Sequence, residues 1–128
     1  MADLGNRANV MGPQPIMPVQ EKPPEMLATA ERVLDLLVEG NQIALEALAA
    51  DDTRAQVASI AQAACGRKYS RSEITGIART AAHYWIKGRL TGANVEPFTV
   101  QFRLGEGNGR WTIRYAANLT GKRSGWTK

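Results

Sequence analysis

The chain has 128 residues and a formal net charge of +4, with 44% hydrophobic and 22% charged residues. This length corresponds to one domain, and the composition is typical of a folded soluble chain rather than a disordered one. No stretch approaches the roughly 18 apolar residues that a membrane span needs, and the first residues lack the basic and apolar blocks of a secretion signal. We therefore expect a cytoplasmic protein without a transmembrane segment.

Charge is distributed unevenly along the chain. Residues 1–66 carry 4 Lys and Arg against 9 Asp and Glu, whereas residues 67–128 carry 12 against 3. A basic half-chain indicates an anionic partner or complementary docking within an assembly. A difference between two solvated surfaces would produce the same contrast, so both interpretations stay open.

The first 25 residues are predicted to form a Pro-rich extended arm. Prolines at five positions between 13 and 24 remove amide donors and fix φ, and the apolar residues among them follow no strand or helix period. Two interpretations remain: a solvated tail, or an arm that packs Ile16 and Met17 onto a neighbouring subunit.

A single domain is predicted over residues 26–120, and its first part is helical. Apolar residues recur at helical spacing from Met26 to about residue 39, then over residues 42–50, and again from about residue 54 to 65. In the second of these helices, Ile43 is placed on the apolar side.

A fourth, short helix is predicted over residues 71–80. Ser70 and Glu73 have the spacing of a capping box, in which each side chain satisfies a backbone amide of the other residue. Ile74 and Ile77 follow three residues apart, which places them on one face of a helix.

After about residue 82, apolar and polar residues alternate, which is typical of strands with one buried face. Three strands are predicted over residues 83–90, 98–104 and 110–119, joined by short Gly- and Asn-rich turns into an antiparallel meander. The apolar side of this sheet is expected to carry Tyr84, Ile86, Leu90, Phe98, Val100, Phe102, Leu104, Trp111, Ile113, Tyr115 and Ala117. Residues 121–128 are predicted to be a basic C-terminal tail.

This order of elements predicts an α+β fold, with N-terminal helices packed on one face of a C-terminal antiparallel β-meander. Residues 36–52 (LLVEGNQIALEALAADD) resemble the opening helix, glycine turn and short second helix of the nuclear transport factor two-like (NTF2-like) superfamily. Residues 98–113 are similar to its closing hairpin, in which a tryptophan, here Trp111, follows the turn.

The resemblance implies a cone formed by helices and a curved antiparallel sheet. The superfamily contains enzymes that place Asp, His and Tyr inside the cone, and many non-catalytic dimerisation or binding modules that commonly pair through the outer sheet face. The short, non-catalytic members are the closer match, so the resemblance implies a binding module.

Catalytic chemistry finds little support in the residue types. His83 is the natural acid–base candidate, but alternation places it on the same side of the sheet as Lys87 and Arg89, away from the predicted interior. Cys65 falls near a predicted helix C-terminus, where the helix dipole disfavours a thiolate. With one cysteine and one histidine, few metal sites can be built, and we expect no catalytic residue, cofactor or metal.

The candidate site is a basic surface with interleaved aromatic residues on the outer side of the sheet, extended by both tails. An indole on a polar strand side is costly to leave in water, so Trp85 is expected to be covered by a partner. The predicted partner-binding residues are Trp85, Lys87, Arg89, Arg103, Arg110, Arg114, Lys122, Arg123 and Trp126, together with Ile16 and Met17 of the arm.

Three functional hypotheses follow. The first is a non-enzymatic binding or assembly subunit that docks through this face onto an acidic protein partner, a larger complex or another copy of itself. The second is a nucleic-acid-binding module that uses the same cations and aromatic rings. The third is a small-molecule enzyme or ligand carrier with a pocket inside the cone.

Overall fold

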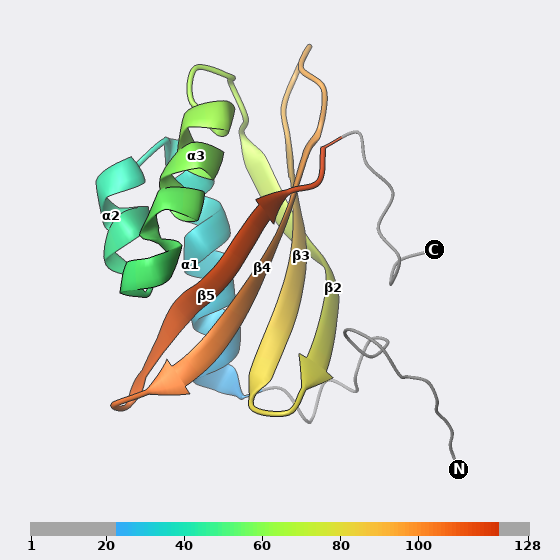
Figure 1. Cartoon of the computed structure of the whole chain (residues 1–128). Coiled ribbons are helices and arrows are strands. Elements are labelled where there is room, and N and C mark those ends of the chain that lie inside the picture. Colours follow the sequence, from blue (N-terminus) through green and yellow to red (C-terminus); the bar gives the residue numbers. More distant parts are fainter. Residues whose placement is uncertain (1–22, 121–128) are drawn as a thin grey trace.

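The computed structural model describes residues 23–120, and Figure 1 shows three helices followed by four strands. The elements are α1 (Pro24–Glu39), α2 (Gln42–Ala47), the 3-10 turn η3 (Asp51–Thr53), α3 (Arg54–Ala64), β2 (Arg71–Thr80), β3 (His83–Thr91), β4 (Phe98–Gly107) and β5 (Arg110–Asn118). None of the helices in this range is both long and apolar enough to cross a membrane.

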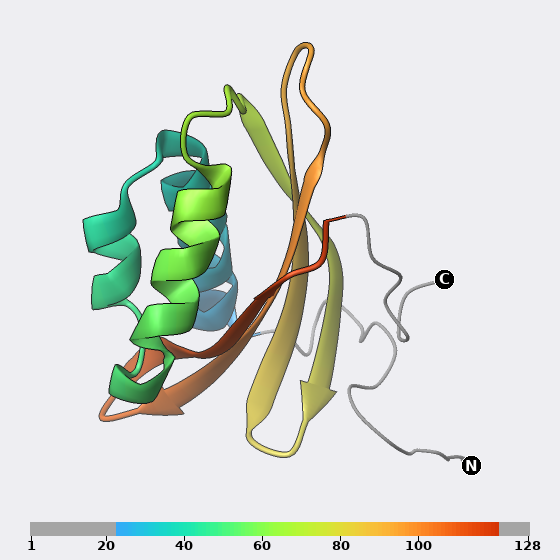
Figure 2. The ribbon, with the colours of Figure 1, turned by 45° about the horizontal axis from the view of Figure 1, so that its top comes forward.

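The four strands form one sheet in the order β2-β3-β4-β5, and every neighbouring pair is antiparallel. All three helices lie on one side of this sheet in both views (Figures 1 and 2). The helix α1 packs against β2 and β3, and α3 packs against β5. The predicted α+β class, with helices before a meander on one sheet face, is confirmed.

The first helix starts at Pro24, two residues before the predicted start, because proline is well suited to the first helical turn. It ends at Gly40, whose φ of 74° is readily adopted only by a residue without a side chain. Asn41 then caps α2 by accepting a hydrogen bond from the amide of Ala44 at 3.1 Å. The predicted burial of Ile43 is wrong: this side chain is 85% exposed on the short helix α2.

The predicted fourth helix is also wrong, because residues 71–80 form the edge strand β2. A β-bulge at Thr75 shifts the register between Ile74 and Gly76. Ile74 then pairs with Gly88, and Ile77 pairs with Ile86, so both isoleucines face the helices despite their spacing of three. The bulge therefore reproduces the spacing of a helix within a strand, and the sheet has four strands rather than three.

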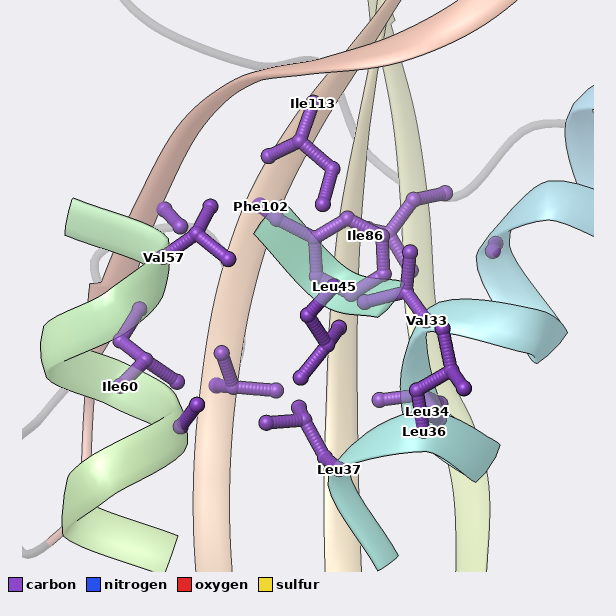
Figure 3. Packing of buried hydrophobic residues seen from close by; sticks show 14 of the residues in the cluster. Val33, Leu34, Leu36, Leu37, Leu45, Val57, Ile60, Ile86, Phe102 and Ile113 are labelled. Carbon is purple, nitrogen blue, oxygen red and sulfur yellow. The ribbon is translucent and has the colours of Figure 1, made fainter. Parts of the chain in front are cut away.

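The core lies between the helices and the inner face of the sheet, as Figure 3 shows for residues of α1, α2, α3 and the strands. The predicted alternation is confirmed in β3 and in β4 as far as Leu104, where every second residue is buried. Phe102 is 1% exposed, and its neighbours across the sheet are Ile86 on β3 and Ala116 on β5.

Alternation fails halfway along β5. A second bulge shifts the register so that Arg103 pairs with Tyr115 and Leu104 pairs with Ile113, which leaves Arg114 as the extra residue. Tyr115 and Ala117 consequently point away from the helices, contrary to the prediction, and Ala116 is buried in their place.

Candidate functional site

We call the sheet face opposite the helices the outer face. Its site residues within the described range are His83, Trp85, Lys87 and Arg89 on β3, Arg103 on β4, and Arg114 and Tyr115 on β5. The structure therefore brings together five of the predicted partner-binding residues, Trp85, Lys87, Arg89, Arg103 and Arg114, on three adjacent strands. The basis is the strand period, which sends odd-numbered residues of β3 and β4 outward.

Trp85 lies at the centre of the outer face. Its indole N–H donates to the Thr80 hydroxyl at 2.8 Å, and its ring centroid is 5.5 Å from that of Tyr115. The Arg103 guanidinium carbon lies 5.5 Å from the Trp85 ring centroid, within cation–π range. Trp85 is therefore partly buried by its own chain, and its burial by a partner stays a prediction.

Arg103 connects Trp85 to β5. One guanidinium nitrogen, Nη2, donates to the backbone carbonyl of Arg114 at 3.4 Å, while Nε is buried without a hydrogen-bond partner. The ion pairs found among the described residues join Arg54 to Asp51 and Arg89 to Glu73. Within residues 23–120, neither Arg103 nor Arg114 is paired with a carboxylate, so their positive charge is available to a ligand.

His83 and Arg114 meet over Gly105, which pairs with His83 across β3 and β4. A Cβ atom added at Gly105 would lie 2.6 Å from His83 Cδ2 and 3.2 Å from Arg114 Cγ. Both side chains thus occupy space that any other residue at position 105 would fill. The absence of a side chain at Gly105 allows the imidazole and the second arginine to approach each other.

The other end of the outer face is less uniformly basic. The Nε atom of Arg89 lies 3.7 Å from a carboxylate oxygen of Glu73 on β2. The pKa of Lys87 is lowered, first by partial burial and then by the charge of Arg89. Within the four strands the carboxylates are Glu73 and Glu106, and Glu106 pairs with Trp111 rather than with an outer-face cation.

One more predicted residue lies in the described range. Arg110 is exposed at the start of β5, where it pairs with Gly107 and so lies at the edge of the outer face, beside the turn from β4. Ile16, Met17, Lys122, Arg123 and Trp126 lie outside the described residues. Sequence reasoning missed Thr80 and Tyr115, because each lies in a segment whose bulge concealed its true side.

The cone interior is filled by hydrocarbon. A cavity of about 10 Å³ remains there, no more than one water molecule needs. It is lined by Val33, Leu37, Leu45, Val57, Ile60, Val100, Phe102, Ile113 and Ala116. No titratable side chain lines this space, and residues 23–120 contain no cluster of three His, Cys, Asp or Glu that could hold a metal ion.

The pKa of His83 is lowered from its ordinary value of 6.5, first by partial burial of the ring and then by repulsion from Arg103 and Arg114. The unfolded chain therefore binds this proton at higher pH than the folded chain does. Stability that depends on neutral His83 is present above pH 6.5 and is lost as the pH falls below that value, until the folded pKa is passed.

We expect Arg103→Gln to raise the pKa of His83, because one of the two repelling charges is removed. His83 is the single histidine, so its imidazole proton signals can be followed by NMR across a pH titration without ambiguity. Arg89→Gln is the control, since the charge of Arg89 acts on Lys87 rather than on His83. An unchanged His83 pKa in the Arg103 variant would show that the charge of Arg103 does not contribute to the lowered pKa.

Among solved structures, the designed NTF2-like protein Rd1NTF2_05, in a version with five substitutions, is similar to this chain. The TM-score is 0.52, and the alignment covers 73% of this chain and 98% of that chain at 13% sequence identity. No protein-family model matches the chain, and no curated protein matches it. At this level of identity the likeness concerns the fold alone: the chain has an NTF2-like α+β fold.

Proposed function

We propose that this protein is a non-enzymatic binding or assembly subunit that docks through its outer face onto an acidic surface of a partner protein. The observation that carries the proposal is the cluster of Trp85, Arg103 and Tyr115, with the unpaired charge of Arg114 beside it. Tryptophan, tyrosine and arginine are the residue types that most often dominate the energy of protein interfaces.

The packing of this cluster supports a role in docking rather than in fold stability alone. The helical side of the sheet holds the apolar core, and the helices cover it completely enough to leave a cavity of only about 10 Å³. The outer face has no such covering layer among the described elements, and large aromatic side chains have nevertheless been placed on it. Because Thr80 and Arg103 already hold the Trp85 ring, which in turn contacts Tyr115, Trp85 loses little conformational entropy on binding.

The charge of the outer face favours an acidic partner. Arg103 and Arg114 lack carboxylate partners within residues 23–120, so an acidic surface would neutralise charge that the chain itself leaves unpaired. Such complementarity orients the partner and accelerates association. Neither of the other hypotheses has comparable support: the rings of Trp85 and Tyr115 contact each other instead of standing free for base stacking, and the cavity between the helices and the middle of the sheet has a volume of only about 10 Å³.

Site-specific photo-crosslinking in the native host tests the proposal. A benzophenone amino acid is placed at Gln101, on the outer-face strand β4, or at Ile43, which is 85% exposed on the helical side. We expect Gln101 to give a protein adduct of defined mass that Ile43 does not give. Combining Arg103→Gln with Arg114→Gln is expected to reduce that adduct about tenfold or more, since an interface then loses two charged contacts.

The outcomes separate the hypotheses. An acidic protein captured from Gln101 and lost in the double arginine variant supports the proposal. An adduct that disappears on nuclease treatment would instead identify a nucleic-acid-binding module. Equal capture from Gln101 and Ile43, or none from Gln101, would contradict docking through the outer face.

A further inference from the structure

Three cationic or protonatable side chains converge at one end of the outer face, beside the β2–β3 and β4–β5 turns at the bottom of Figure 1. His83 starts β3, Arg103 lies two positions before Gly105 on β4, and Arg114 is the bulged residue of β5. We call this group the His–Arg cluster. Its members come from three different strands: His83 and Arg114 meet over the side-chain-free position of Gly105, and Arg103 donates to the Arg114 carbonyl.

We infer that the His–Arg cluster is a binding site for a phosphomonoester group, and that it recognises a phosphorylated side chain of the partner or a free phosphate. A phosphorylated partner as the source of the phosphate rests on the proposed docking function. The binding of a phosphate group rests only on the residues of the His–Arg cluster.

Donor geometry supports a phosphate. Arg103 uses Nη2 for the Arg114 carbonyl, and its buried Nε has no partner, so this guanidinium retains unused hydrogen-bonding capacity. Arg114 is exposed, and a Cβ atom at Gly107 would lie 2.9 Å from its Nη2 atom, so its side chain extends over two glycines. Guanidinium groups bind phosphate oxygens through parallel charge-assisted hydrogen bonds, and protonated imidazole adds a further donor.

Electrostatics point in the same direction. The charges that face His83 come from Arg103 on β4 and Arg114 on β5, while its neighbour on β2 is the uncharged Thr80. No carboxylate among the described residues offsets them, and together with burial they lower the pKa of His83. A bound dianion would reverse this repulsion and raise the pKa of the imidazole.

A single phosphoryl group suits this cluster better than a nucleic-acid strand does. Single-strand binders combine a continuous basic track with aromatic platforms on which successive bases stack. Here the Trp85 ring contacts Tyr115, and Arg103 lies over it. The ring face on which a base would stack is therefore already covered. Further along β3, Arg89 is already paired with Glu73, which interrupts the track.

The test is an NMR titration of the full chain, following the single imidazole of His83. The probes are inorganic phosphate, a blocked phosphoserine residue, its unphosphorylated form and a 20-nucleotide thymidine strand, all at constant ionic strength. Phosphate and phosphoserine are expected to shift the His83 signals to saturation and to raise the His83 pKa, while blocked serine is expected to have no effect.

Three variants locate the site. Arg114→Gln is expected to raise the phosphate Kd about tenfold or more, as the loss of a charge-assisted hydrogen bond does. Gly105→Ala is expected to weaken binding because its Cβ would displace His83. Arg71→Gln, at the opposite end of the sheet where Arg71 pairs with Thr91, is the matched control and should leave Kd unchanged.

Each outcome is decisive. Saturation by phosphate but not by phosphoserine supports the site with free phosphate as its ligand, and saturation by both supports a phosphorylated partner. A shift of the His83 signals that does not saturate with phosphate or phosphoserine overturns the inference, as does tighter binding of the thymidine strand with equal loss in the Arg71 and Arg114 variants. Failure here leaves the crosslinking result intact, because an acidic surface without phosphate would still crosslink at Gln101.

Discussion

Replacing Phe102 with alanine is expected to lower the free energy of unfolding by about 3–5 kcal/mol, as is typical for truncation of a buried aromatic residue. Phe102 is 1% exposed and lies in the middle of β4, between Ile86 and Ala116. It also lines the cavity of about 10 Å³, so the space vacated by its ring would merge with an existing void. Since small domains have a total stability of about 5–15 kcal/mol, this one substitution would leave the fold marginal.

Urea unfolding followed by circular dichroism measures the free energy of unfolding. Both variants are fitted with the same m value, the slope of this free energy against urea concentration. The matched control is Ile43→Ala, because Ile43 is an aliphatic residue of the same domain that is 85% exposed. Its stability should change by no more than about 0.5 kcal/mol. Similar losses in the two variants would show that the packing between sheet and helices is not as described.

The position of Phe102 was predictable from the sequence. In β3 and β4, apolar and polar residues alternate, so each strand has only one orientation that buries its apolar side chains. A shift by one residue would expose all of them. The same alternation places Trp85 and Arg103 on the outer face, so core and candidate site were obtained from one pattern.

The strand β2 was not predictable in this way, because a bulge changes the period it interrupts. Ile74 and Ile77 are three residues apart, a spacing that a regular strand would send to opposite faces. The extra residue Thr75 brings both to the inner face, and the local sequence then has the signature of a short helix. Without the neighbouring strand, nothing in residues 71–80 distinguishes these two structures.

The candidate site was predicted in composition but not in detail. The bulge at Arg114 turns Tyr115 outward, where its ring contacts Trp85. This contact joins β5 to the aromatic centre of the outer face, which the sequence pattern alone did not predict. Thr80 entered the site for a similar reason, since its hydroxyl is available to Trp85 only when residues 71–80 form a strand. Bulges are frequent beside functional sites, where they redirect a side chain.

The close approach of α1 to the sheet leads to a second large expected effect, at Leu34 and Gly88. Gly88 is on the inner face of β3, and a Cβ atom there would lie 2.6 Å from Leu34 Cδ2 and 2.9 Å from Cδ1. Leu34 is 1% exposed. Leu34→Ala is expected to cost about 2–5 kcal/mol by leaving a cavity, and Gly88→Ala about 1–3 kcal/mol by overpacking.

The two substitutions together are expected to cost less than the sum of the single changes, by about 0.5–3 kcal/mol, as is found for residues in direct contact. The reason is geometric: the methyl group added at position 88 enters space that the leucine side chain has vacated, so each change relieves the other. Urea unfolding of the single and double variants measures this coupling. The control pair is Leu34→Ala with Ile113→Val on β5, separated from β3 by β4, for which the costs should add within about 0.5 kcal/mol. Additivity at Leu34 and Gly88 would mean that α1 does not rest on β3 through this contact, and the helical layer would then need a different placement over the sheet.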